Sequence, residues 1–257
     1  MKKSRNIADL GAPLLFITLL LVLWELFVRL GEIPEWILPG PLQILKTFAE
    51  TLTLMLKHAR VTMIECLVGF GISIILAFVI ALLMDELPVV RKALYPLLVT
   101  SQTVPIVSVA PLFIIWFGYG ITPKILVVIL VCFFPIVISL LGGLASVDQD
   151  YLKLFRSMGA SKIAIFRMVK LPLSLPSFFS GLKISAAYSV MGAVIGEWLG
   201  AKEGLGNYLT LSQRSFMVDR VFAAILAITV LSLLLFAVIV VLEWLIIPWN
   251  RLNELQE

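Results

Sequence analysis

The chain has 257 residues, of which 61% are hydrophobic and only 14% charged, with a formal net charge of +4. Soluble domains are nearer half apolar and a quarter charged, so the composition excludes an ordinary soluble protein and predicts an all-α integral membrane protein. The length fits one domain over residues 1–257. The small net charge gives no indication of nucleic-acid binding, and the two cysteines, both inside apolar runs, predict neither a disulfide framework nor a metal site.

The first apolar run covers residues 11–30 and follows Lys2, Lys3 and Arg5. A basic start before an apolar run is typical of signal peptides, but this run is long enough to span a bilayer and no small-residue cleavage site follows it. We therefore expect an uncleaved first transmembrane helix.

The segment that follows, residues 41–60, has apolar side chains such as Leu42, Leu45 and Phe48 at helical spacing. This periodicity predicts an amphipathic helix near the outer membrane surface. His58 is the single histidine and has no metal-ligand cluster around it, so we expect a surface or interfacial side chain.

Six segments are apolar over about 20 residues, the length that crosses a bilayer core of about 30 Å. Only helices satisfy their own backbone in lipid segment by segment, so each is predicted as a helix. In chain order the spans are residues 11–30, 63–84, 94–117, 125–144, 178–199 and 221–247. Pro105 and Pro111 predict kinks in the third span and Pro135 in the fourth, which are typical either of a lined pathway or of packing alone.

Six spans place both termini on one side of the membrane. About twelve of the Lys and Arg residues fall on that side and about eight on the other. The positive-inside rule then places both termini and the basic loop 146–176 in the cytoplasm. On the opposite side, the glycine-rich segment 200–220 predicts either a docking surface or gate, or a solvated connector.

The basic loop 146–176 predicts two short helices. Asp148 or Asp150 is placed to cap the first helix, Gly159 to end it, and Ser161 to cap the second.

Two prolines follow the second loop helix. We expect Pro172 to stop that helix and Pro176 to bound the approach to the fifth span. A basic loop alone is usually an orientation signal or a binder of anionic lipid. A glycine turn, a proline stop and apolar anchors are instead typical of a rigid knob that docks on a partner protein.

The loop also carries the pattern GAxxxxxFxxVxLPxxxP, which resembles the core motif of membrane permease subunits of binding-protein-dependent ABC importers. The fixed positions are matched by Gly159, Ala160, Phe166, Val169, Leu171, Pro172 and Pro176. The family's leading Glu-Ala-Ala is replaced by Lys153, Leu154 and Phe155, which puts the geometry of the first loop helix in question.

The resemblance extends over nearly the whole chain. It includes LPGPLQIL at residues 38–45, TVPIVSVAPLFIIWFGYG at 103–120 and GEWLGAKEGLG at 196–206. These segments resemble the subfamily that imports nitrate, alkanesulfonates, taurine and pyrimidine precursors of thiamine. Residues 181–206 most resemble hydroxymethylpyrimidine permeases, and riboflavin permeases are similar in the same stretch.

The resemblance implies the type I ABC importer transmembrane fold, in the bacterial cytoplasmic membrane. It implies a homodimer of this chain with two ATPase subunits and an extracytoplasmic solute-binding protein. The sequence has no GxxxxGK[ST] phosphate loop, so we expect no catalytic residue, metal or cofactor in this chain and ATP and Mg bound by the ATPase. The implied ATPase-coupling residues are Leu154, Phe155, Met158, Gly159, Ala160, Ser161, Phe166, Leu171, Pro172 and Pro176.

Polar side chains inside spans usually face the interior of a helix bundle. We therefore expect the substrate pathway among Gln102, Thr103, Ser185, Tyr188, Ser189 and Glu197. Tyr188 is placed either to stack on a planar heterocycle or to pack between helices. Glu65 and Glu197 lie near the outer span ends, where interfacial exposure explains them equally well.

The expected function is a permease for a thiamine-precursor pyrimidine of the hydroxymethylpyrimidine type. Riboflavin, alkanesulfonate, taurine and nitrate permeases are the alternatives within the family. An ion-coupled secondary transporter is the alternative from another class, and it would need charges inside the spans and often an internal repeat. A channel would need a filter-like run, and a membrane enzyme would need a cluster of His, Asp or Glu.

Overall fold

The computed structural model describes residues 7–249, with side chains from residue 11 onward. All regular structure in that range is helical, as the composition predicts. The elements are α1 Ile7–Leu30, α2 Pro41–Glu86, α3 Pro88–Ser101, α4 Ile106–Phe117, α5 Thr122–Ala145, α6 Gln149–Ser157, α7 Lys162–Ile165, the π-helical turn η1 Phe166–Lys170, α8 Leu171–Trp198, α9 Leu205–Arg214 and α10 Val218–Ile246.

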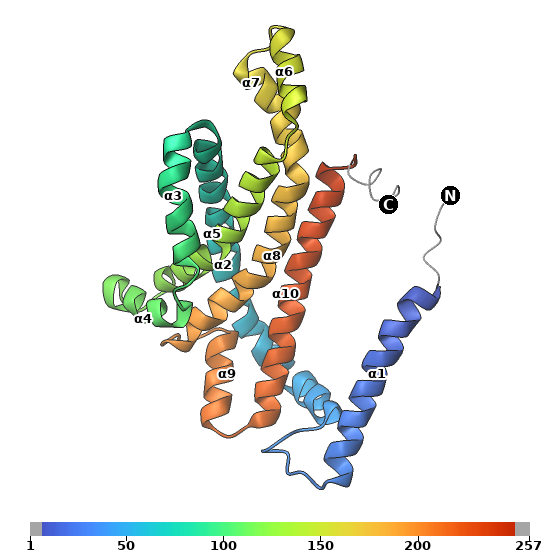
Figure 1. The fold of residues 1–257 in the computed structure, drawn as a ribbon. Helices are drawn as coiled ribbons and strands as arrows, with labels where there is room; N and C mark the ends of the chain where they lie inside the picture. Colours follow the sequence, from blue (N-terminus) through green and yellow to red (C-terminus); the bar gives the residue numbers. More distant parts are fainter. Residues whose placement is uncertain (1–6, 250–257) are drawn as a thin grey trace.

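Within the described residues, five helices are long and apolar enough to cross a membrane, or six if α3 and α4 together count as one broken span. Figure 1 shows α2, α5, α8 and α10 side by side as a long bundle. The short helices α6 and α7 project from one end of this bundle, and α9 lies at the opposite end.

Glycines allow α8 to approach α5 closely along the centre of the bundle. A Cβ added at Gly181 would lie 2.7 Å from Ser139 Cβ, and one at Gly143 would lie 2.7 Å from Ser177 Cβ. Small residues at such contacts are typical of helix association in membranes, where close backbone approach replaces the hydrophobic effect. This seam fixes α5 and α8 as the core pair of the fold.

The amphipathic segment after Pro41 is not a separate surface helix, contrary to the prediction. It continues without a break into the second span, and α2 runs for 46 residues from Pro41 to Glu86. No proline or helix-ending residue interrupts the segment after its start, so helix propagation continues wherever the packing allows it.

The predicted third span is also different from expectation. The chain forms two helices, α3 and α4, whose axes differ by 102° across the break at residues 102–105. Pro105 stands at the N-cap of α4, where a proline is compatible with the helix start, whereas Pro111 lies inside α4 without ending it.

Pro172 and Pro176 do not end or bound a helix either. The segment from Lys162 to Trp198 is helical throughout its 37 residues. The π-helical turn η1 precedes Pro172, and its closing bond runs from the Leu171 N–H to the Phe166 carbonyl. The helical segment therefore continues through both prolines, with the π-helical turn directly before Leu171 and Pro172.

The first helix, α1, stands apart from the bundle in Figure 1 and touches it mainly near one end. There Glu25 accepts a hydrogen bond from the Leu42 N–H at 3.1 Å, at the start of α2. Trp24 also packs against Phe222 of α10, with ring centroids 5.8 Å apart. The carboxylate of one helix thus caps the N-terminus of the next.

Candidate functional site: the projecting loop and two polar regions of the bundle

The turn between α6 and α7 is built by the local chemistry that the sequence predicts. Asp148 caps α6 by accepting a bond from the Asp150 N–H at 2.8 Å, and Ser161 caps α7 by accepting one from Ala164 N–H at 3.2 Å. Gly159 follows α6 with φ of +79°, a left-handed conformation in which glycine carries no Cβ penalty.

The projecting segment has a small hydrophobic core of its own. Val147, Leu152, Ile165 and Val169 are buried together, with Phe155 and Ala160 packed against them. Three other apolar side chains point away from this core and are mostly exposed: Leu154 at 55%, Met158 at 73% and Ile163 at 66%. The segment is therefore a packed knob with an apolar tip (residues 147–170). It is here called the coupling knob, after the role that the sequence resemblance implies.

An ion pair that the sequence reading did not anticipate attaches the coupling knob to the bundle. Lys170 Nζ lies 2.6 Å from Asp85 Oδ2 at the end of α2, with side-chain exposures of only 22% and 12%. Phe166 lies beside this pair and lines a groove against the α2 end together with Asp85 and Glu86. The sequence does contain a signal for this ion pair, because the acidic Asp85 directly follows the predicted second span on the same side as the basic loop 146–176.

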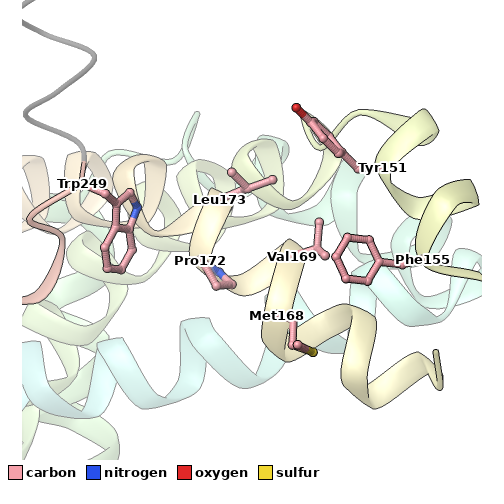
Figure 2. A pocket seen from close by; sticks show the side chains of 7 residues that line it. All are labelled: Tyr151, Phe155, Met168, Val169, Pro172, Leu173 and Trp249. Carbon is pink, nitrogen blue, oxygen red and sulfur yellow. The ribbon is translucent and has the colours of Figure 1, made fainter. Parts of the chain in front are cut away.

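A second groove, of about 560 Å³, runs along the other side of the knob toward the end of α10. Figure 2 shows Phe155 next to Val169, with Pro172 and Leu173 farther along and Trp249 at the far end. The lining is almost entirely apolar and includes Tyr151 and Met168. Pro172, expected as a helix stop, instead forms part of this groove wall.

The predicted pathway residues separate into two groups. Gln102 and Tyr188 line one cavity of about 320 Å³ at the break between α3 and α4. Thr103 lies in the same break and is exposed, and its hydroxyl donates to the Thr100 carbonyl at 2.8 Å.

Ser185 and Ser189 do not line this cavity. Both are fully buried, and each hydroxyl donates to a backbone carbonyl: Ser185 to Cys132 at 2.9 Å and Ser189 to Ala186 at 2.8 Å. In the apolar membrane interior, a serine hydroxyl on a helix commonly donates its hydrogen bond to a nearby backbone carbonyl. In this conformation the two serines are therefore part of the helix packing, and a pathway role for them stays a prediction.

Glu197 is buried rather than interfacial, with 1% of its surface exposed. Its Oε1 accepts a bond from the Thr62 hydroxyl at 2.6 Å, and its Oε2 accepts one from the Gly206 N–H at 2.5 Å. Nearby Glu65 is equally buried and pairs with Lys124 of α5 at 2.6 Å. Both carboxylates belong to a buried polar network near the turn between α8 and α9, here called the outer turn after the side of the membrane that the sequence predicts for it.

The outer turn, residues 199–204, is also fastened from α2. His58 Nδ1 accepts a bond from the Gly204 N–H at 3.0 Å, so this histidine has a structural partner that its sequence context did not reveal. Lys57 pairs with Glu203 at 2.9 Å. The hydrogen bond and charge of Lys57 hold the pKa of the Glu203 carboxyl below its usual range.

A pocket of about 960 Å³ opens beside the outer turn. Its lining includes Tyr119 and Gly120, the paired Glu65 and Lys124, and Lys202 of the outer turn itself. The molecule thus has a pocket lined by charged residues beside the turn before α9 and a knob with an apolar tip at the other end. Helix α8 runs between these two ends of the bundle (Figure 1).

Comparison with protein families gives one match over most of the chain. Residues 69–247 match the model of the "Binding-protein-dependent transport system inner membrane component". This range includes the coupling knob, the broken span and the outer turn.

Two relatives are similar over most of their length. The formylaminopyrimidine transport permease protein ThiX of Halalkalibacterium halodurans is 40% identical over 98% of this chain and 99% of the relative. The riboflavin transport system permease protein RibX of Chloroflexus aurantiacus is 33% identical over 94% of this chain and 90% of the relative.

Among solved structures, an amino acid ABC transporter matches with a TM-score of 0.61 at 15% identity, covering 79% of this chain and 96% of that chain. At this identity the likeness establishes the fold, which is that of type I importer transmembrane domains.

Proposed function

The chain belongs to the family of binding-protein-dependent transport system inner membrane components, and we propose that it is the permease subunit of an ATP-driven importer for a thiamine-precursor pyrimidine. The observation that carries the substrate class is the 40% identity, over 98% of the chain, to a formylaminopyrimidine permease. A riboflavin importer is the second candidate, because a riboflavin permease is 33% identical over 94% of the chain.

The family's transport role supports two partners, a cytoplasmic ATPase and an extracytoplasmic binding protein. The coupling knob is the docking element for the ATPase in this proposal. Its packed core holds its shape, and its exposed Leu154, Met158 and Ile163 supply apolar anchors of the kind that protein interfaces use. ATP and Mg are then bound by the partner, and this chain serves as a non-catalytic subunit.

A second copy of the chain completes the proposed permease. Residues 101–105, at the break between α3 and α4, are exposed in the single chain. Irregular backbone at membrane depth is tolerated only where protein buries it or where it lines a water-filled cavity. A partner copy facing this break would bury the irregular backbone and enclose a water-filled cavity beside it. In this proposal Gln102 and Tyr188, which line the cavity at the break, lie on the solute pathway between the copies.

Orientation follows from the same arrangement. The α10 helix ends on the α6–α7 side of the bundle in Figure 1, and α1 begins toward that side. Since the ATPase is cytoplasmic, we place both chain ends in the cytoplasm and the outer turn outside, in agreement with the positive-inside rule.

Co-purification tests the importer assignment. An affinity-tagged permease, extracted in mild detergent, is expected to retain an ATPase subunit in equimolar amount. A secondary transporter would retain none, so reproducible absence of an ATPase would contradict the proposal.

Solute binding tests the substrate class. The binding protein that stimulates ATP hydrolysis by the complex is screened by calorimetry against aminopyrimidines, flavins, sulfonates and nitrate. Binding of an aminopyrimidine supports the first candidate, and binding of riboflavin alone replaces it with the second.

A further inference from the structure

Three successive amide groups at the start of α9, those of Gly204, Leu205 and Gly206, are satisfied by side chains from other helices. Gly204 precedes α9 and has no side chain with which to cap it. Instead, His58 Nδ1 accepts from the Gly204 N–H at 3.0 Å, Thr62 Oγ1 from the Leu205 N–H at 2.9 Å, and Glu197 Oε2 from the Gly206 N–H at 2.5 Å. The cap of α9 is therefore supplied by α2 and α8.

These contacts form a closed unit, here called the outer clamp (His58, Thr62 and Glu197). Thr62 accepts from Leu205 and at the same time donates to Glu197 Oε1 at 2.6 Å, so one hydroxyl joins all three helices. His58 and Thr62 lie one turn apart on α2, and Glu197 lies in the last turn of α8. Thr62 and Glu197 are 0% and 1% exposed.

Burial makes this clamp rigid. A buried N–H that loses its acceptor bears the full cost of desolvation, so the bonds from the buried Leu205 and Gly206 N–H groups are costly to break. Glycine at position 206 also permits the close fit, because a Cβ there would lie 2.6 Å from the Val194 carbonyl oxygen. The outer turn and α9 are thus held to the end of α8 and cannot swing independently of it.

The other end of the same helix carries the coupling knob. From Lys162 to Trp198 the chain is helical for 37 residues, about 55 Å at 1.5 Å per residue. This continuous helical segment therefore begins in the coupling knob, which faces the ATPase in the proposal. It ends in the turn that carries Glu197 of the outer clamp.

We infer that Glu197, Thr62 and His58 are positioning residues that fix the outer turn to α8, so that movement of α8 driven by the ATPase is transmitted to the outer pocket. This inference rests on the proposed function, since it requires an ATPase on the coupling knob. It assigns Glu197 a mechanical role in gating, in place of the solute contact that its sequence position suggested.

Thiol labelling of the outer turn tests the inference in the intact complex. Lys202 lines the outer pocket and is exposed, whereas the native Cys66 and Cys132 are fully buried and contribute little background. The K202C complex with its ATPase is placed in nanodiscs. Its labelling rate with a membrane-impermeant maleimide is measured without nucleotide and after trapping with ATP and orthovanadate.

The clamp variants are compared in this K202C background. Trapping is expected to change the labelling rate by at least about fivefold, the lower end of typical coupling between sites. Thr62→Val removes a donor and an acceptor at constant shape and should reduce the change to less than about twofold. Thr62→Ser keeps the hydroxyl and should restore it. Thr210→Val is the matched control, because the Thr210 hydroxyl bonds only the Gly206 carbonyl of its own helix, at 2.9 Å.

Each outcome is decisive. Full nucleotide response in Thr62→Val, or no response at position 202 in the K202C complex that has an intact clamp and active ATPase, overturns the clamp's role in transmission. Absence of any ATPase from the wild-type complex instead contradicts the proposed function. If Thr62→Val fails to assemble, Glu197→Gln replaces it: the amide retains an oxygen for Thr62 and loses the acceptor for Gly206, and a full response in that variant also overturns the inference.

Discussion

The ion pair between Lys170 and Asp85 is expected to hold the coupling knob in the orientation that the ATPase recognises. The two charged atoms are 2.6 Å apart, and the side chains are 22% and 12% exposed. Exposed pairs contribute about 0–1 kcal/mol, and breaking a buried pair costs about 3–5 kcal/mol. An intermediate burial gives about 2 kcal/mol, which corresponds to about 30-fold in an equilibrium constant.

The perturbation is Asp85→Asn, which removes the charge and nearly preserves the shape. We expect about 30-fold weaker binding of the ATPase to the permease in nanodiscs, measured by interferometry, because the loosened knob must be ordered again on binding. Lys170→Met should have a similar effect. The charge swap that combines Asp85→Lys with Lys170→Asp should recover most of the affinity.

The chain supplies a matched control for this experiment. Lys153 and Asp150 form an ion pair of 2.9 Å on the same knob, but their side chains are 73% and 83% exposed. Asp150→Asn is therefore expected to leave ATPase binding unchanged. If Asp85→Asn weakens binding no more than Asp150→Asn does, the pair does not orient the knob and the reasoning fails.

Three further predictions follow from local geometry. Gly143→Val should lower the yield of folded protein and the melting temperature, since its Cβ would meet Ser177 Cβ at 2.7 Å. The neighbouring Gly142→Val should lower neither, since nothing lies within 4 Å of a Cβ added there. Equal effects of the two variants in a fluorescence-detected melting assay would argue against the α5–α8 seam. Gly159→Pro should abolish nucleotide-dependent labelling at the outer turn because its φ of +79° is inaccessible to proline, and an unchanged response would exclude the knob as coupling element. Finally, K202C should react with an impermeant maleimide in right-side-out vesicles and not in inverted ones; the opposite result would reverse the proposed orientation.

Local chemistry in the coupling knob could be predicted from the sequence. Asp148, Gly159 and Ser161 act where their residue types predict, because capping and left-handed turns depend on a few neighbouring atoms. The assignment to an all-helical membrane fold was likewise accessible, because hydropathy alone determines which segments enter lipid.

Features that depend on tertiary packing were not predictable in the same way. Pro105 stands at a 102° break, but Pro172 lies in an unbroken helix, and the difference is a π-helical turn that no residue type specifies. Ser185 is predicted on the pathway because polar side chains inside spans usually face the bundle interior, and that prediction stays untested. The sequence pattern cannot distinguish a carbonyl partner, here Cys132, from a solute.

The outer clamp shows the same limit from the opposite direction. His58 and Thr62 are separated from Gly204 and Leu205 by more than 140 positions. The spacing of His58 and Thr62 by one helical turn places both on the same face of a helix. The sequence does not indicate which segment packs against that face, so their partners could not be predicted.

The contact between Glu25 and the start of α2 has a consequence for shortened forms of this protein. Leu42 donates its N–H to the Glu25 carboxylate at 3.1 Å, and Gly40 before it offers no side-chain cap. A truncated chain that starts after residue 30 would therefore leave α2, the longest described helix, without the carboxylate that caps its N-terminus. The removed helix α1 otherwise contributes little to the bundle core. Fusion partners and purification tags belong ahead of α1, where they leave this junction intact.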